Sequence, residues 1–262
     1  MAIYAEVAGE GPELVLVHEG ICDSRMWDEQ WERYTREFRV LRCDLRGFGR
    51  SALEPGTFSN AQDLVEVLEQ HGFENAALLG VSLGGRVALE VAVARPDLVS
   101  ALVLVAPGLP GHDWSQELQH AWGEEEAALE AGDLAEAVEV NLRTWVDGPG
   151  REPEDVDPAV RARVAEMQLR AFELQIPIGE AAEEELLVPD LADRLSEVKA
   201  PTLILGGDED VPDMQAIAER LEREIPGSRR EIISNTAHVP SMERPDEFDR
   251  LVLGFLDEVE AA

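Results

Sequence analysis

Short apolar runs alternate with amphipathic stretches along the first 108 residues of the chain. The run at 13–18 is almost continuously apolar, which is typical of a strand buried on both faces of a parallel sheet. The pattern predicts strands at 3–8, 13–18, 39–43, 76–79 and 101–105, and helices at 24–38, at 60–71 and directly after residue 82. This alternation of strands and helices predicts an α/β fold with a mostly parallel, doubly wound sheet.

The pattern changes between residues 109 and 198, where no strand-like run occurs. Helical spacing of apolar residues recurs there near 115–130, 133–146, 158–175 and 189–195. The α/β pattern then returns, with strands at 201–205 and 230–233 and helices at 214–223 and 246–259. The sequence therefore predicts an α/β core formed by residues 1–108 and 199–262, with residues 109–198 as a helical cap over one end of the sheet.

Several large aromatic residues lie in the predicted cap, namely Trp114, Trp122, Trp145 and Phe172. We expect the aromatic residues of the cap to help line an apolar substrate pocket. The alternative for each tryptophan is that it packs only in the interior of the cap.

Acidic residues outnumber basic residues by 55 to 22, which gives a net charge of −33. A surface this negative repels nucleic acid and anionic membranes, so we expect neither as a partner. No apolar run is long enough to span a bilayer, and the N-terminus lacks the pattern of a secretory signal. Cys22 and Cys43 are too few for a disulfide framework or a zinc site. We therefore expect a cytoplasmic protein without a metal, and a homodimer is one option for its assembly.

The segment Gly80-Val81-Ser82-Leu83-Gly84 joins a predicted buried strand to a predicted helix. A strand, a sharp turn of small residues and a helix form the setting of a nucleophile elbow, which exposes a serine hydroxyl at the end of the strand. The first N–H groups of the following helix favour an anion at that point. We therefore predict Ser82 as a nucleophile. The alternative is a buried serine in a glycine-rich turn.

A serine nucleophile needs a general base and a carboxylate that orients this base. Asp208 and Asp210 follow one predicted strand and His238 follows the next, so all three are expected at the same sheet edge as Ser82. The order serine, aspartate, histidine along the chain is one of those known for such triads. A metal site at the acidic cluster is disfavoured because no histidine lies at ligand spacing nearby. The other histidines are weaker candidates for the base because none follows the last strand; they are His18, His71, His112 and His120.

At these residues the chain resembles the α/β-hydrolase family, in particular its capped, cofactor-free members. The resemblance covers nearly the whole chain, and the segments that carry it are 18–27, 44–51, 80–85, 201–210 and 238–245. The resemblance implies that Asp210, rather than Asp208, orients His238. It also implies that the backbone N–H groups of Gly20 and Leu83 form the oxyanion hole, and that no cofactor is needed.

The resulting prediction is a serine hydrolase that cleaves a small carboxylic ester or lactone through an acyl-enzyme intermediate. A C–C bond hydrolase or a perhydrolase could use the same triad, and a ligand-sensing protein of this fold is a further alternative. Glu19 departs from the family pattern, in which a glycine usually follows the histidine of this loop. Because a carboxylate that faced the hole would oppose a developing oxyanion, we expect Glu19 to turn away and to pair with Arg46, Arg86 or water.

Overall fold

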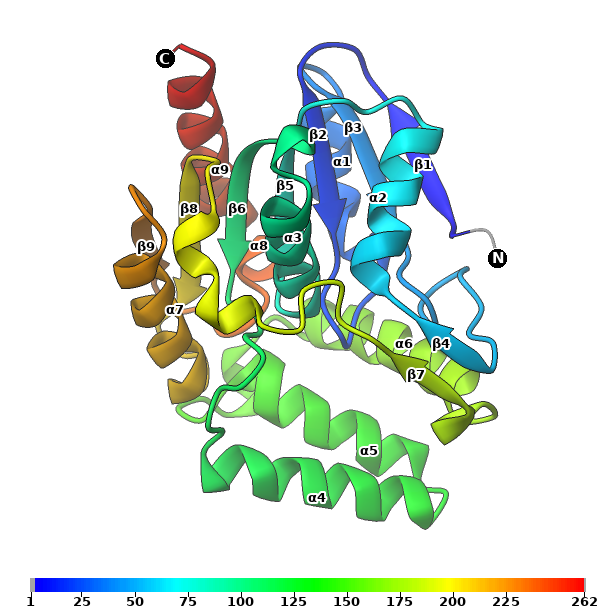
Figure 1. Ribbon diagram of the computed structural model, residues 1–262. Helices are drawn as coiled ribbons and strands as arrows, with labels where there is room; N and C mark the ends of the chain where they lie inside the picture. Colours follow the sequence, from blue (N-terminus) through cyan, green and yellow to red (C-terminus); the bar gives the residue numbers. More distant parts are fainter. Residues whose placement is uncertain (1–2, 262) are drawn as a thin grey trace.

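A seven-stranded sheet runs through the computed structural model, which describes residues 3–261, and its strand order is β1-β3-β2-β5-β6-β8-β9 (Figure 1). The strands are β1 (Ala5–Ala8), β2 (Glu13–Val17), β3 (Arg39–Cys43), β5 (Ala76–Val81), β6 (Val99–Val105), β8 (Thr202–Gly207) and β9 (Arg229–Ile233). Only the edge strand β1 is antiparallel to its neighbour, and all other pairs in this sheet are parallel. The predicted α/β fold with a mostly parallel sheet is confirmed.

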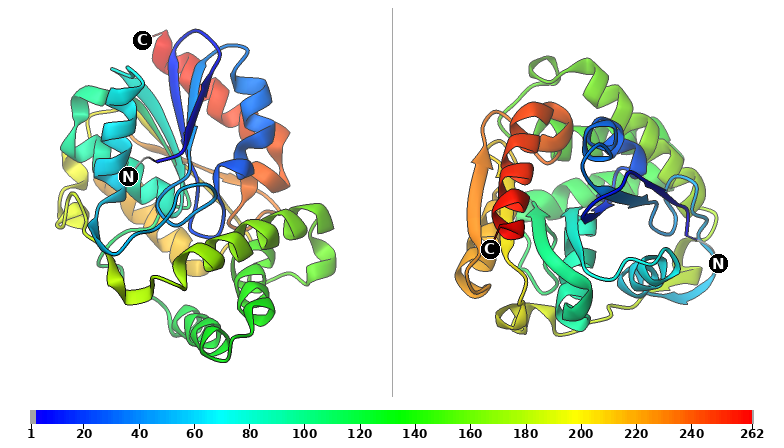
Figure 2. Two further views of the ribbon diagram at one scale, coloured as in Figure 1. Left: turned by 90° about the vertical axis from the view of Figure 1, so that its right-hand side faces the viewer. Right: turned by 90° about the horizontal axis from the view of Figure 1, so that it is seen from above.

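Helices cover both faces of this sheet (Figure 2). On one face lie α2 (Asn60–Gln70), α3 (Leu83–Ala94) and α7 (Pro212–Glu224), and on the other lie α1 (Asp28–Tyr34) and α9 (Pro245–Glu260). Successive side chains of a strand point to opposite faces, so Leu14 and Leu16 pack with α9, whereas Val15 and Val17 pack with α2 and α3. Burial on both faces explains why the predicted strands are continuously apolar.

A mostly helical segment joins β6 to β8 and lies across the end of the sheet at which the parallel strands finish (Figure 1). It contains α4 (Gln116–Glu130), α5 (Leu134–Asn141) and α6 (Pro158–Gln175), and α5 continues as a π-helical turn at Leu142–Asp147. The short helix α8 (Pro240–Glu243) follows β9. The predicted boundaries of the core at residues 1 and 262 lie outside the described range.

Two predictions for residues 109–198 are wrong. The helix expected at 189–195 is instead two 3-10 turns, at Leu191–Asp193 and Leu195–Glu197. One buried leucine in each turn satisfies the apolar spacing that suggested a continuous helix. The segment also contains a short strand, β7 (Ala182–Glu184), which pairs in parallel with β4 (Gly56–Phe58). An Ala-Glu-Glu segment has no apolar alternation, so its sequence gave no sign of a strand.

No helix among residues 3–261 is both long enough and apolar enough to cross a membrane.

Candidate active site

Ser82 occupies the sharp turn between β5 and α3. Its backbone has φ 49° and ψ −109°, a conformation that a residue with a side chain rarely adopts and that costs about 1–3 kcal/mol. The neighbouring glycines allow the turn: a Cβ at Gly80 would lie 2.2 Å from the carbonyl oxygen of Gly84. The backbone of Ser82 is also anchored, because its N–H donates to Val105 at 2.9 Å and its carbonyl accepts from Gly108 at 3.0 Å. The fold thus holds Ser82 in a strained and fixed position.

Parallel register brings the remaining predicted site residues to this end of the sheet. Val17 at the end of β2 pairs with Gly80 of β5, so the loop after β2 lies beside the turn that carries Ser82. Gly207 at the end of β8 pairs with Ile233 at the end of β9, so the loops that carry Asp210 and His238 lie side by side.

Asp210 and His238 are in direct contact and are both buried. His238 Nδ1 lies 2.8 Å from Asp210 Oδ2. A carboxylate can only accept, so this contact places the proton on Nδ1 and leaves Nε2 available as a base. The other carboxylate oxygen, Asp210 Oδ1, accepts the Val211 N–H at 2.8 Å. Asp208 instead is exposed and accepts the backbone N–H of Asn235 at 2.6 Å.

The imidazole of His238 is enclosed by protein. Its ring packs against that of Trp145, with 4.5 Å between the ring centroids, and its backbone N–H donates to the Trp145 carbonyl at 3.0 Å. Burial alone would lower the pKa of His238, but the charge and hydrogen bond of Asp210, with a further contribution from Glu19, raise the pKa above its ordinary value. Within residues 3–261, no hydrogen bond joins His238 to the hydroxyl of Ser82.

The backbone around the predicted oxyanion hole is fixed by His18. The Leu45 N–H donates to His18 Nε2 at 2.9 Å, so Nδ1 carries the proton and donates to the Glu19 carbonyl at 2.7 Å. Burial lowers the pKa of His18, which keeps the ring neutral. In a trans peptide the N–H points opposite to the carbonyl, so the Gly20 N–H points away from His18. Gly20 is also next to Leu83, since a Cβ on Gly20 would lie 3.9 Å from Leu83 Cβ.

The expectation for Glu19 is wrong. Its side chain is buried, and Oε2 lies 3.7 Å from His238 Nε2, the atom that would take a proton from Ser82. Its other oxygen, Oε1, accepts from the thiol of Cys22 at 3.0 Å. The two arginines proposed as partners are already paired: Arg46 with Asp63, and Arg86 with Glu90 and Glu184. These arginines bind carboxylates on α2, α3 and β7, so their charges are balanced without Glu19.

The aromatic residues of the segment 109–198 divide into two groups. Trp145 contacts His238, as described above, whereas Trp114 and Trp122 meet edge to face with ring centroids 5.4 Å apart. Phe172 is buried in the hydrophobic core cluster. The contact of Trp145 depends on the π-helical turn that carries it, and nothing in the local sequence indicates that turn.

The remaining histidines lie elsewhere. His112 contacts Asp213 at 3.1 Å, His120 lies 3.7 Å from Glu124 on the same helix, and His71 is exposed at the end of α2. His18, as described above, has a structural role. Among the described residues there is no group of three or more His, Cys, Asp or Glu side chains arranged to hold a metal ion.

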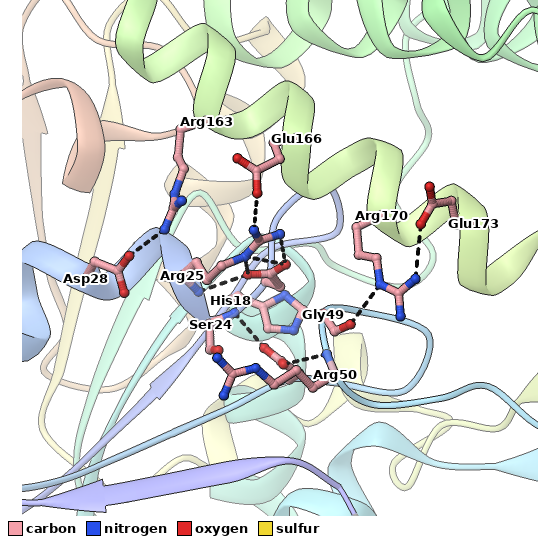
Figure 3. Close-up of polar contacts among 12 residues, drawn as sticks. His18, Ser24, Arg25, Asp28, Gly49, Arg50, Arg163, Glu166, Arg170 and Glu173 are labelled. Carbon is pink, nitrogen blue, oxygen red and sulfur yellow. Dashed lines mark hydrogen bonds and ion pairs between the residues drawn. The ribbon is translucent and has the colours of Figure 1, made fainter.

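Ion pairs that the sequence did not predict join α6 to the core (Figure 3). Arg25 pairs with Glu166, and Arg163 pairs with Asp28. The side chain of Arg170 donates to the Gly49 carbonyl at 3.2 Å. The contacts of Arg25 and Arg170 border a cavity of about 640 Å³ between α6 and the loops after β2 and β3, and none of the predicted triad lines that cavity. The contacts link residues more than 100 positions apart, which local sequence patterns do not reveal.

A second cavity, of about 390 Å³, lies next to Leu83, the residue that follows Ser82. Leu83 lines it together with three other apolar side chains, Phe48, Leu53 and Phe58. Polar residues of the lining include Arg46, Asn60, Gln175 and Glu184. The pairing of β4 with β7 brings Phe58 and Glu184 together at this cavity.

Comparison with known proteins gives a consistent result. The family model described as "Alpha/beta hydrolase family" matches residues 14–251. The chain is 29% identical to the pimeloyl-[acyl-carrier protein] methyl ester esterase of Nitrosospira multiformis, covering 97% of this chain and 98% of that protein. It is similarly 29% identical to the protein of the same name from Vibrio atlanticus, with 97% of each chain covered.

Solved structures show the same relationship. A thermophilic esterase from Thermogutta terrifontis superposes with a TM-score of 0.80 at 28% identity, covering 98% of this chain and 93% of that chain. A hydrolase from Pseudomonas aeruginosa superposes with a TM-score of 0.78 at 28% identity, covering 97% of this chain and 94% of that chain. An N-acyl homoserine lactone degrading enzyme superposes with a TM-score of 0.75 at 25% identity, covering 97% of this chain and 96% of that chain.

Proposed function

Because the chain belongs to the α/β hydrolase family, we propose that it is a serine hydrolase that cleaves a small carboxylic ester or lactone with Ser82, His238 and Asp210. The observation that carries this proposal is the buried His238–Asp210 pair at the same end of the sheet as the strained turn of Ser82. Relatives and structural neighbours named as esterases and a lactone-degrading enzyme support the substrate class.

The reaction follows from the positions of these groups. His238 Nε2 removes the hydroxyl proton of Ser82 as Oγ forms a bond to the carbonyl carbon of the substrate. The N–H groups of Gly20 and Leu83 donate to the oxyanion, and each such donor is worth about 2.7–4 kcal/mol in the transition state. The imidazolium then protonates the leaving alcohol. Water, activated by the same nitrogen, releases the acid from Ser82.

The cavity next to Leu83 is the proposed substrate site. Its volume of about 390 Å³ is near the lower end of the range for small-molecule pockets. Apolar side chains such as Phe48 and Leu53 suit the carbon chain of an ester. Arg46 is the one basic side chain in the described lining, so the cavity is not built for a highly anionic substrate. We propose that the segment 109–198 acts as a cap, because α6 and β7 contribute residues to this lining.

Turnover of p-nitrophenyl acetate and butyrate, together with a simple lactone, tests the function. We expect many cycles from the wild type and a fall in kcat of about a million-fold in Ser82→Ala. Ser196→Ala provides a matched control, since Ser196 is exposed and far along the chain from the elbow. A single slow burst without turnover would favour a ligand-sensing protein instead. Release of a ketone from a diketone, without ester cleavage, would favour a C–C bond hydrolase.

A further inference from the structure

Two buried carboxylates face His238 from opposite sides of its ring. Asp210 Oδ2 lies 2.8 Å from Nδ1, and Glu19 Oε2 lies 3.7 Å from Nε2. The three side chains are at most 2% exposed, so water screens their charges very little. The triad proposed above uses one carboxylate only, and the second is left without a role.

Glu19 is held in this position by its own loop. The His18 ring and the backbone N–H of Cys22 both donate to its carbonyl, at 2.7 and 3.4 Å. The thiol of Cys22 donates to Oε1, which leaves Oε2 directed at His238. In the part of the chain that the structure describes, no lysine or arginine lies within 4 Å of the Glu19 carboxylate. The cation available to it is therefore protonated His238.

We propose that Glu19 is a second positioning residue for His238. The Glu19 carboxylate stabilises the imidazolium through Nε2, so His238 keeps its Nε2 proton and cannot act as the base for Ser82 until the pH rises. This inference rests on the proposed role of His238 as the general base. In the protonated form, Nδ1–H faces Asp210 and Nε2–H faces Glu19. Loss of the Nε2 proton to solvent exposes the lone pair that accepts the proton of Ser82 during attack on the ester. The same imidazolium is then formed again, opposite the same two carboxylates.

The charges around the pair favour this assignment. Two further titratable groups contact the site: Cys22, on the loop after β2, donates to Glu19, and Glu243, on α8, accepts the backbone N–H of Ala237 beside His238. Burial raises the pKa of Cys22 well above its usual range, so its thiol stays neutral. Glu243 is paired with Arg151 at 2.6 Å, which balances its charge.

The contribution that each partner makes to the other's pKa has the sign that an ion pair requires, although burial keeps the pKa of Glu19 above its ordinary value. Burial raises the pKa of Glu19, and the positive charge of His238 opposes that rise. The pKa of His238 is raised although burial acts against it, because Asp210 and then Glu19 favour the charged form. Removing the charge of Glu19 must therefore lower the pKa of His238, so the base becomes free at lower pH.

Titration of His238 by NMR tests this inference without relying on turnover. The protein contains five histidines, and His238→Gln identifies the resonance of interest. In a Ser82→Ala background, Glu19→Gln should lower the titration midpoint of His238 by about one pH unit or more, as expected for an opposite charge within 4–6 Å. Glu10→Gln is the matched control: it makes the same substitution at an exposed glutamate outside the site, so the midpoint should stay near the wild-type value.

The pH dependence of kcat/KM provides the second measurement, with Ser82 intact. The acid limb of Glu19→Gln should move to lower pH by the same amount as the NMR midpoint, while the plateau at high pH falls only a few-fold. Glu19→Ala should shift both in the same direction, which provides a second variant if glutamine prevents folding. An unchanged NMR midpoint and acid limb in a folded variant would overturn the inference. A lowered NMR midpoint in a protein that hydrolyses no ester would support the His238–Glu19 pair and refute the proposed function instead.

Discussion

Asp210→Asn should nearly abolish catalysis without changing the fold, because it reverses the hydrogen bond to the base. Asp210 Oδ1 accepts the Val211 N–H at 2.8 Å, which fixes the carboxylate so that Oδ2 faces His238 Nδ1. In the asparagine variant the amide oxygen must take the position of Oδ1, so the NH2 group faces Nδ1. Nδ1 then becomes the acceptor, the proton moves to Nε2, and no lone pair remains for Ser82.

The loss expected from this wrong tautomer is about 10,000-fold in kcat, as in other serine triads. Four decades correspond to about 5.4 kcal/mol of transition-state stabilisation. Steady-state hydrolysis of p-nitrophenyl butyrate measures the change, and circular dichroism checks the fold. Asp208→Asn is the control, because Asp208 is exposed and an amide oxygen can still accept the Asn235 N–H. An Asp210→Asn variant within tenfold of the wild type, or a greater loss in Asp208→Asn, would refute the reasoning.

Three further outcomes follow from the same structure. Gly84→Ala places a Cβ 2.4 Å from a backbone carbonyl oxygen and should lower the free energy of unfolding by about 1–3 kcal/mol in urea titrations. The control is Gly123→Ala, because a Cβ there meets no atom within 4 Å, and this variant should instead stabilise α4 by up to about 1 kcal/mol. His18→Ala releases the Glu19 carbonyl and should lower kcat about 100-fold with little change in KM, whereas a change in KM alone would contradict its proposed role in orienting the oxyanion loop. The raised pKa of His238 keeps the base protonated to higher pH, so kcat/KM of the wild type should fall as the pH drops. The midpoint of this fall should lie above the ordinary histidine pKa of about 6.5, and a midpoint below that value would contradict the assignment of His238 as the base.

The sheet could be predicted because its physical signature is local. Strands such as β5, buried on both faces, are continuously apolar, and helices such as α9 show a regular apolar stripe. The turn at Ser82 could also be predicted, because only small residues fit where the strand meets the helix. Strand β7 could not, because its pairing with β4 depends on a partner more than 120 residues away.

The surroundings of the site could be predicted only in part. The sequence placed Asp210 and His238 after neighbouring strands, and the contact between them agrees with that placement. The prediction that Glu19 pairs with Arg46 or Arg86 is wrong, because the oxyanion is only one of the charges that act on its carboxylate. A carboxylate beside the oxyanion hole is unfavourable by itself, but the protonated imidazole of His238 is a buried cation with which Glu19 can pair. That contact joins two loops that are distant in sequence, so local sequence patterns do not reveal it.

The most direct test of the account is the site of covalent modification by an alkyl phosphonate ester, read by mass spectrometry of the digested protein. A phosphonate reacts with an activated serine and leaves a stable adduct in the oxyanion hole, so it reports both the nucleophile and its activation. We expect one adduct per chain, on the peptide that contains Ser82, and no adduct in Ser82→Ala. An adduct on another residue, or an unmodified wild type that still hydrolyses esters, would contradict the assignment of Ser82 as the nucleophile.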